Sequence, residues 1–287
     1  MRNVVAIDMR YVENLYSGLS RFSLNIFQNL IKYSSDDDIN FIILMPPKNI
    51  SKDLNFINGL NLKKIKIIYS KNKRGLRWKI PFFIFDLKLY SKLRSENVEV
   101  FLSPYIDPPL LPGIKVIPTI HDLIFIRVKN YFNNLRFFKR ILAEFRIILT
   151  LLYSHNVLTV SRTTKDILIY RYQFLPFIKK KLNDITVIYN GITKFKDSKN
   201  KYQKRSFSFN KEYFLYVGDR RNHKNLFYTI ELIKNYNLEY KKNFKLIIAG
   251  SDSYKNHKLK RNIKANLFVK EIINPNDFVL NELYQRC

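Results

Sequence analysis

The stretch YFLYVGDRRNHKNLFYTIELI, residues 213–233, combines the signals that decide the fold. Its first five residues are apolar or aromatic and form a run of the length of a buried strand, and Gly218 follows them directly. From about Asn225 the apolar residues recur with the period of a helix. A strand, a glycine loop and a helix in this order are typical of an α/β fold with a parallel sheet.

The same alternation of short apolar runs and longer helical segments extends along the chain. Strands are predicted at Val4–Ile7, Phe41–Leu44, Ile65–Ile68, Val98–Leu102, Val116–Thr119, Val157–Val160, Thr186–Ile188, Tyr213–Val217, Phe244–Ala249 and Leu267–Val269. Helices are predicted around Phe22–Leu30, at Lys79–Arg94 and Leu135–Tyr153, from Asn225, and in the final stretch DFVLNELYQRC. We therefore predict an α/β protein whose parallel strands are covered by helices on both faces of the sheet.

A polar stretch, TKFKDSKNKYQKRSFSFNKE, has no apolar period and separates two α/β series. We predict an N-terminal Rossmann-like domain over residues 1–192, a linker over residues 193–212, and a C-terminal domain over residues 213–287. The last of these is shorter than the ~100–150 residues usual for a doubly wound domain. We expect this second domain to be partial.

The chain is strongly basic, with 51 Lys and Arg against 23 Asp and Glu and a net charge of +28. Such a charge attracts nucleic acid, anionic lipid or phosphorylated substrates. The sequence is also rich in Asn, Ile, Phe and Tyr, a pattern that biased genome composition produces, so part of the charge excess carries no function. Because the charge is spread over the chain and no nucleic-acid-binding module is recognised, no nucleic acid partner is expected.

Cysteine use and hydropathy indicate the compartment. The one cysteine, Cys287, excludes an internal disulfide and multi-cysteine metal sites, which fits a reducing environment. No apolar run has the length of a spanning helix, and the first ten residues, MRNVVAIDMR, lack the apolar core of a signal peptide. We expect a cytoplasmic protein, either soluble or peripheral at the inner face of the plasma membrane.

The loop at residues 218–224 is the strongest candidate site. Gly218 clears space at the strand end, Arg220 and Arg221 can fork onto phosphate oxygens, and Lys224 stands where the next helix begins. Together with the helix dipole these groups predict an anion site that fits a diphosphate. The alternative interpretation is a solvated basic turn.

Two further loops follow strands. Gly18 permits close approach of a ligand to the backbone, or is an ordinary turn glycine. His121 comes just after an apolar strand and beside Asp122, where it could hydrogen-bond a sugar hydroxyl or move a proton, or simply be structural. No G-x-G-x-x-G or Walker A motif is present, and no spacing predicts a metal site.

Two segments combine aromatic and basic residues, KNKRGLRWKIPFFIF at residues 71–85 and RFFKRILAEFRIILTLLY at residues 136–153. In the second, an apolar stripe recurs at helical spacing: Phe138, Ile141 or Leu142, Phe145, Leu149 and Leu152. Core packing is the default interpretation of such a stripe. Because Arg and Lys flank it, docking on a membrane surface is the alternative.

Six segments in order resemble landmarks of the GT4-type glycosyltransferases of the GT-B fold. They are VVAIDMRYVENLYSGLSRFSLNIFQNL, FLSPYIDPPLLPGIKVIPTIHDLIF, NVLTVSRTTKDIL, ITVIYNGI, YFLYVGDRRNHKNLFYTIELI and FKLIIAGSD. The resemblance runs over nearly the whole chain, and the mannosyltransferase-like members that build lipopolysaccharide O-antigen are the most similar in character.

This resemblance implies two Rossmann-like domains facing a cleft, transfer of a hexose such as mannose from a nucleotide-sugar with retention of configuration, and an acceptor that is a surface glycan or lipid-linked glycan. It implies no cofactor and no metal ion, the nucleotide-sugar being a substrate. By position, Gly18 approaches the donor phosphates, His121 is the active-site histidine, and Lys224 holds the diphosphate. The family's arginine after the glycine is replaced by Asp219, so Arg220 or Arg221 would substitute for it.

The main departure from the family lies at the end of the chain. Members continue past the segment matching LNELYQRC into a motif rich in Glu and Gly that grips the donor sugar and ribose, and nothing here corresponds to it. We expect a chain truncated at its C-terminus. The alternative to an active transferase is an inactive remnant that acts as a binding or membrane-associated module.

Overall fold

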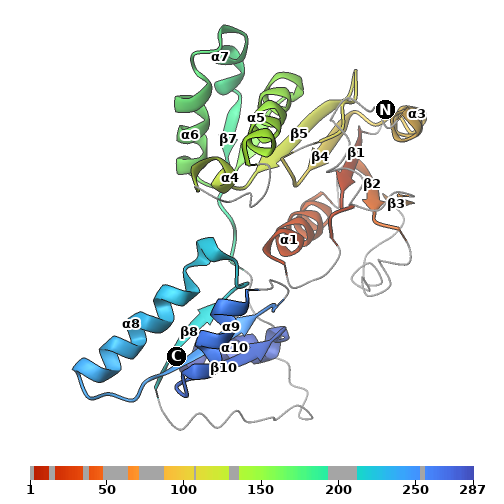
Figure 1. Ribbon diagram of the computed structural model, residues 1–287. Coiled ribbons are helices and arrows are strands. Elements are labelled where there is room, and N and C mark those ends of the chain that lie inside the picture. Colours follow the sequence, from red (N-terminus) through yellow and green to blue (C-terminus); the bar gives the residue numbers. More distant parts are fainter. Residues whose placement is uncertain are drawn as a thin grey trace. The chain divides into compact units, whose positions relative to one another are not determined.

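The computed structural model describes residues 3–12, 17–34, 39–47, 64–70, 87–106, 108–128, 136–192, 212–252 and 256–287. The chain divides into two compact units, Met1–Gly191 and Ile192–Cys287 (Figure 1). The basic segment at residues 71–85 lies outside the described residues, and so does the predicted linker apart from Glu212.

The first unit is built on a seven-stranded parallel sheet in the order β3-β2-β1-β4-β5-β6-β7. Its strands are β1 (Asn3–Asp8), β2 (Ile39–Met45), β3 (Ile65–Tyr69), β4 (Val100–Ser103), β5 (Lys115–Ile120), β6 (Val157–Thr159) and β7 (Ile185–Val187). Its helices are α1 (Gly18–Tyr33), α3 (Leu87–Ser95), α4 (Ile124–Arg127), α5 (Arg136–Tyr153), α6 (Arg162–Tyr172) and α7 (Pro176–Leu182). The chain adds strands on one side of β1 and then, from β4, on the other side, so the order reverses between β1 and β4.

Alternating side chains of the central strands pack into two different hydrophobic cores. Ile7 and Ile43 pack with Phe27 of α1, whereas Ala6 and Ile42 pack with Leu93 of α3. Because successive residues of a strand point to opposite faces, α1 and α3 lie on opposite faces of the sheet.

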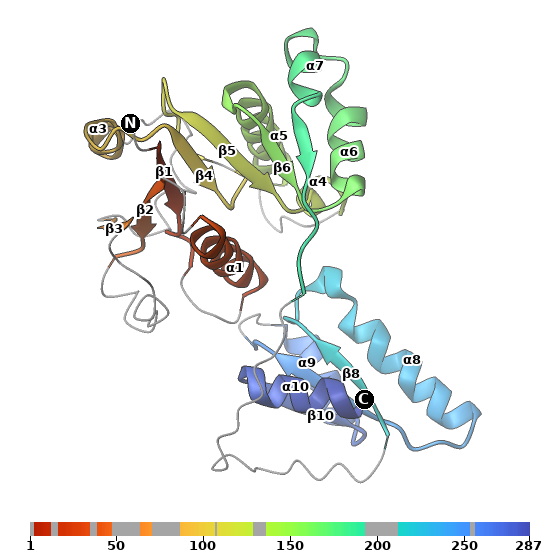
Figure 2. The same ribbon diagram turned by 180° about the vertical axis from the view of Figure 1, so that it is seen from behind.

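Helices α5, α6 and α7 gather beside strands β5 to β7, as Figures 1 and 2 show. Their core contains Ile147 and Leu151 of α5, Leu168 of α6 and Ile178 of α7. Ile120 of β5 belongs to the same core. This cluster buries Ile120, the last residue of β5, directly before His121.

The second unit has a three-stranded parallel sheet in the order β10-β9-β8 among its described residues. Its elements are β8 (Tyr213–Val217), the 3₁₀ turn η3 (Asn222–Lys224), α8 (Leu226–Glu239), β9 (Lys245–Gly250), α9 (His257–Ala265), β10 (Val269–Ile273) and α10 (Asp277–Arg286). Helices α8 and α9 pack with Leu246 and Ile248, whereas α10 packs with Ile247 through Leu283. The sheet is therefore doubly wound, as the sequence predicts.

The predicted strands and helices occur in the predicted order, with one strand misplaced, and residues 79–86 of the predicted helix Lys79–Arg94 lie outside the described residues. Helices α4, α6, α7 and α9 were not predicted. Leu267–Val269 was predicted as the last strand, but β10 begins at Val269 and continues to Ile273. Leu267 is almost fully exposed and lies outside the strand. An edge strand needs fewer apolar residues than a central one, so Lys270 and Glu271 concealed it in the sequence.

Candidate functional site

Two glycines bring the carboxyl ends of β8 and β9 unusually close together. Gly250 has φ +146°, and a Cβ built there would lie 2.1 Å from the carbonyl oxygen of Gly218. Gly218 itself has φ +156°, and its N–H donates to Ala249 O at 2.9 Å. The absence of a side chain at Gly250 therefore lets the backbone of Gly218 pack directly against it at the strand ends.

Arg220 turns inward instead of facing a ligand. Its side chain is 3% exposed, and its Nε and Nη2 donate to Glu271 Oε1 of β10 at 3.1 and 2.6 Å. Its Nη1 donates to Ser251 O, just after β9, at 2.6 Å. One buried guanidinium thus links the chain segments that follow β8 and β9 to the middle of β10, a structural function that the sequence did not indicate.

Arg221 is exposed and engages Asp219 two residues earlier. The Arg221 Nε donates to Asp219 Oδ2 at 2.7 Å, and the Arg221 N–H donates to Oδ1 at 3.2 Å. Burial alone would raise the pKa of Asp219, but the hydrogen bonds from Arg221 and the charges of Arg221 and Lys224 together lower it. The carboxylate is therefore ionised and competes with any anionic ligand for Arg221.

Lys224 is exposed at the end of η3, immediately before α8. Asn225 follows in the left-handed conformation, φ +52°, and no side chain caps the first turn of α8. The first turn contains no acidic residue either. A lysine beside uncapped helical N–H groups provides positive charge and directed donors at the same place.

The first unit has a different edge at its topological switch point. Asp8 is fully buried at the end of β1, and Arg10 binds it with Nε–Oδ1 and Nη2–Oδ2 distances of 2.7 Å. Next to this pair, the rings of Tyr11 and Tyr105 lie 3.9 Å apart between centroids. Ligands of open α/β sheets bind where the strand order reverses, which here is between β1 and β4.

Gly18 is the first residue of α1, after the N-cap Ser17, whose Oγ accepts from Ser20 N at 3.0 Å. A Cβ at Gly18 would meet nothing within 4 Å. The packing of the chain itself therefore does not require a glycine here, in contrast to Gly250. The open space beside Gly18 leaves its role at the donor phosphates as a prediction.

His121 lies at the carboxyl end of β5 and is held from two sides. Its Nε2 is 2.9 Å from Pro104 O, and its ring meets Phe22 edge to face at 4.5 Å. Because a carbonyl oxygen only accepts, Nε2 carries the proton and Nδ1 of the neutral ring is an acceptor. Burial lowers the pKa of His121 and outweighs the opposite effects of Pro104 O and Asp122, so the ring is neutral at pH 7.

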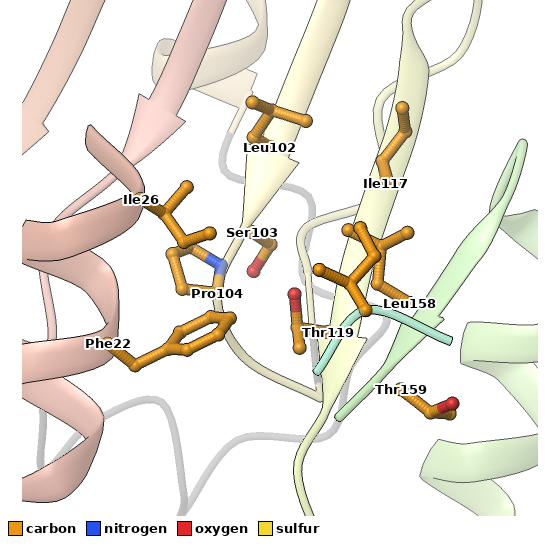
Figure 3. A pocket seen from close by; sticks show the side chains of 10 residues that line it. Phe22, Ile26, Leu102, Ser103, Pro104, Ile117, Thr119, Leu158 and Thr159 are labelled. Carbon is orange, nitrogen blue, oxygen red and sulfur yellow. The ribbon is translucent and has the colours of Figure 1, made fainter. Parts of the chain in front are cut away.

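A small cavity of about 40 Å³ lies next to His121, on the α1 face of the sheet. Figure 3 shows Phe22 and Ile26 of α1 facing Leu102, Thr119 and Leu158 of the strands. Phe22 and Pro104, which contact the imidazole, also line this cavity. The edge of the first unit thus combines an apolar hollow with a neutral hydrogen-bonding ring.

The comparisons with known proteins concern both the second unit and the whole fold. Residues 197–287 match the family model of the glycosyl transferases group 1. This match covers about a third of the chain and includes Gly218, Arg220, Arg221 and Lys224. No curated protein matches the sequence closely enough to count as a relative.

Solved structures match over nearly the whole chain at low sequence identity. A putative UDP-N-acetylglucosamine 2-epimerase from Listeria monocytogenes has a TM-score of 0.53 and 10% identity, with 99% of this chain and 72% of that chain covered. The S. aureus MnaA–UDP structure has a TM-score of 0.51 and 10% sequence identity, with 99% of this chain and 71% of that chain covered. Arabidopsis thaliana UGT89C1 with UDP has a TM-score of 0.50 and 13% sequence identity, with 95% of this chain and 70% of that chain covered. The fold is of the GT-B type, with Rossmann-like units.

The predicted site residues fall into two groups, one in each unit. Gly18 and His121 lie on the edge of the first sheet. The other predicted residues lie in the loop after β8: Gly218, Arg220, Arg221 and Lys224. Three further features of these edges were not predicted from the sequence: the Asp8–Arg10 pair, Gly250 and Glu271. An acidic residue closing the apolar strand VVAID and a glycine closing LIIAG were visible signals, whereas nothing in the sequence links Glu271 to Arg220.

Proposed function

We propose that the protein transfers a sugar from a nucleoside-diphospho-sugar, and that the β8–α8 loop binds the diphosphate. The observation that carries this proposal is exposed Lys224 beside the uncapped N-terminus of α8, within the segment that matches the glycosyl transferases group 1 model. Backbone N–H groups and a lysine are the donors that phosphate oxygens accept in α/β proteins.

Charge development during the reaction assigns a catalytic contribution to the same loop. Cleavage of the bond between sugar and diphosphate leaves negative charge on the leaving phosphate and oxocarbenium character on the sugar. Lys224 and the helix dipole stabilise that leaving charge from fixed positions, which lowers the barrier. The proposal gives this work to the chain's own groups and includes no metal ion or cofactor.

His121 is proposed to act in the same reaction through its free acceptor nitrogen. A neutral imidazole with Nε2–H held by Pro104 O presents Nδ1 to a sugar hydroxyl. The hydrogen bond fixes the orientation of the ring, and the low pKa keeps it unprotonated. In this proposal His121 orients a hydroxyl of donor or acceptor and receives its proton when required.

The finer parts of the proposal are retention of configuration, a hexose such as mannose as the transferred sugar, and a surface or lipid-linked glycan as acceptor. The resemblance of the motif series to GT4-type enzymes supports them. The similar solved structures with UDP in their names support a nucleotide donor in general. GDP and UDP are therefore the first ligands to compare.

Thermal unfolding of the full chain with GDP, UDP or pyrophosphate, at fixed physiological salt, tests the donor site. We expect a rise in midpoint that differs between GDP and UDP, disappears in Lys224→Ala and persists in Lys234→Ala, which removes an exposed lysine farther along α8. An equal rise with pyrophosphate in both variants would show only polycation behaviour and overturn the proposal.

A transfer assay then separates catalysis from binding. The chain is incubated with the nucleotide-sugar whose nucleotide gave the larger shift, and release of nucleoside diphosphate is followed with a polyprenyl-linked glycan as acceptor. Release that His121→Gln lowers supports the assigned catalysis. Binding of nucleotide with no release with any acceptor would favour a protein that binds the nucleotide without catalysing transfer.

A further inference from the structure

The N-terminal half of α5 exposes large apolar side chains. Phe137 and Phe138 are 71% and 70% exposed, and Ile141 and Leu142 are 50% and 38% exposed. The apolar stripe of this helix was expected to pack into the core. That expectation holds for the C-terminal half, where Leu149 is buried, and is wrong for the N-terminal half.

These four side chains form one continuous stripe, here called the α5 stripe (Phe137, Phe138, Ile141 and Leu142). At about 100° per residue they occupy a sector about 140° wide. Lys139 and Arg140, both exposed, fall on the two sides of this sector. An apolar sector with a cation along each border is the pattern of a helix that lies in a membrane interface.

The C-terminal half of α5 holds the stripe rigidly. Ile147 and Leu151 are fully buried in the core of the first unit. Thr150 Oγ1 donates to Ile106 O at 2.7 Å, which adds a polar attachment. The stripe is therefore a fixed feature of the surface and needs no folding step before it can dock.

The charges around the stripe select the kind of surface that it fits. The single acidic residue of α5, Glu144, is engaged by the Arg171 guanidinium and the Tyr172 hydroxyl. The Glu144 carboxylate is thus paired within the unit, and the cations Lys139 and Arg140 border the stripe in a chain of net charge +28. A surface complementary to this patch is apolar with an anionic boundary.

We propose that the α5 stripe docks the protein on an anionic lipid bilayer. The stripe enters the boundary between headgroups and acyl chains, and Lys139 and Arg140 reach the lipid phosphates. Among the described residues, no helix has both the length and the apolar character needed to cross a membrane. The contact is peripheral, and its strength depends on both apolar area and lipid charge.

Cosedimentation of the full chain with vesicles tests the proposal. We compare phosphatidylcholine alone with a mixture that contains phosphatidylglycerol. Phe137→Ala/Phe138→Ala is expected to lower partitioning onto the mixed vesicles by about tenfold, because two large apolar side chains no longer leave water. The matched control is Phe174→Ala/Phe177→Ala, which removes two phenylalanines that are 71% and 59% exposed elsewhere in the same unit.

Several outcomes would overturn the assignment. They are absence of vesicle binding by the unmodified chain, equal partitioning of the Phe137→Ala/Phe138→Ala variant, or loss of binding only in the control. Circular dichroism verifies that both variants fold. A Lys139→Glu/Arg140→Glu variant should lose the preference for phosphatidylglycerol, as should high salt. A dimer without lipid that the first variant dissociates would instead show that the stripe binds a second copy of the chain.

Discussion

The carboxyl edges of the two sheets have the same backbone architecture and opposite chemistry. At the edge of the first unit, Asp8 and Arg10 neutralise each other and His121 is held neutral beside an apolar cavity. At the edge of the second unit, Lys224 is exposed next to a helix terminus without a cap. Parallel α/β sheets bind ligands at this edge in either case, so the residues placed after each strand decide which ligand fits.

The contrast extends to the arginines, and it shows how position decides function. Arg10 and Arg220 form ion pairs with carboxylates inside their units, whereas Arg221 pairs with Asp219 at the surface. Three arginines near predicted sites therefore have structural ion pairs, and the exposed lysine has the best placement for a ligand.

The largest effect is expected from Gly250→Ala. The new Cβ would lie 2.1 Å from Gly218 O, so the ends of β8 and β9 would have to separate, at a cost of about 4 kcal/mol in the free energy of unfolding. Urea denaturation followed by circular dichroism measures it. Gly18→Ala, with open space around the new methyl group, should change stability by less than about 0.5 kcal/mol. Equal effects of the two substitutions would contradict this account of the strand ends.

Arg220→Met should have the next largest effect. It leaves Glu271 and Ser251 O without their guanidinium partner and lowers the free energy of unfolding by about 3 kcal/mol. Arg221→Met removes an exposed ion pair instead and should cost less than about 0.5 kcal/mol. The same denaturation measurement tests both, and a larger loss in Arg221→Met would show that the buried network has been misassigned.

A smaller effect concerns pH and the first unit. The pKa of His121 is lowered in the folded protein, mainly by burial, so the unfolded state binds more protons as pH falls through 6.5. The contribution of the neutral His121 ring to the free energy of unfolding is complete above pH 6.5 and is lost as the pH falls below that value. His121→Gln should flatten the pH dependence of unfolding between pH 7 and 5, whereas His257→Gln, at an exposed position, should retain it.

The smallest effect should come from Asp219→Asn. Removal of this ionised carboxylate frees Arg221 and removes a negative charge close to Lys224, so nucleoside diphosphate affinity should rise by about threefold. Isothermal titration calorimetry measures the change. Glu239→Gln makes the same change in net charge at the other end of α8 and should leave affinity unaltered. Weaker binding in Asp219→Asn would mean that the carboxylate orders the loop for its ligand.

Much of the fold could be predicted because its evidence is local. The apolar run at residues 246–249 indicates the central strand β9, because a buried parallel strand must be apolar on both faces. The bounds of the edge strand β10 were predicted wrongly because Lys270 and Glu271 reach solvent and interrupt the apolar pattern. Helix α5 and its stripe could be predicted from periodicity, but the period alone does not distinguish a stripe that faces the core from one that faces solvent.

The sequence by itself determined the α/β alternation, the parallel sheets and the strand-to-helix loops that carry Gly18, His121 and Lys224. Periodicity and turn chemistry act over a few residues, so one chain segment is enough to specify them. Only the tertiary structure decided that Arg220 is buried against Glu271, 51 residues away, that Gly250 abuts Gly218, and that His121 is held by Pro104. Those outcomes depend on which strands become neighbours, because the side chains that neutralise, bury or orient a residue come from distant parts of the chain.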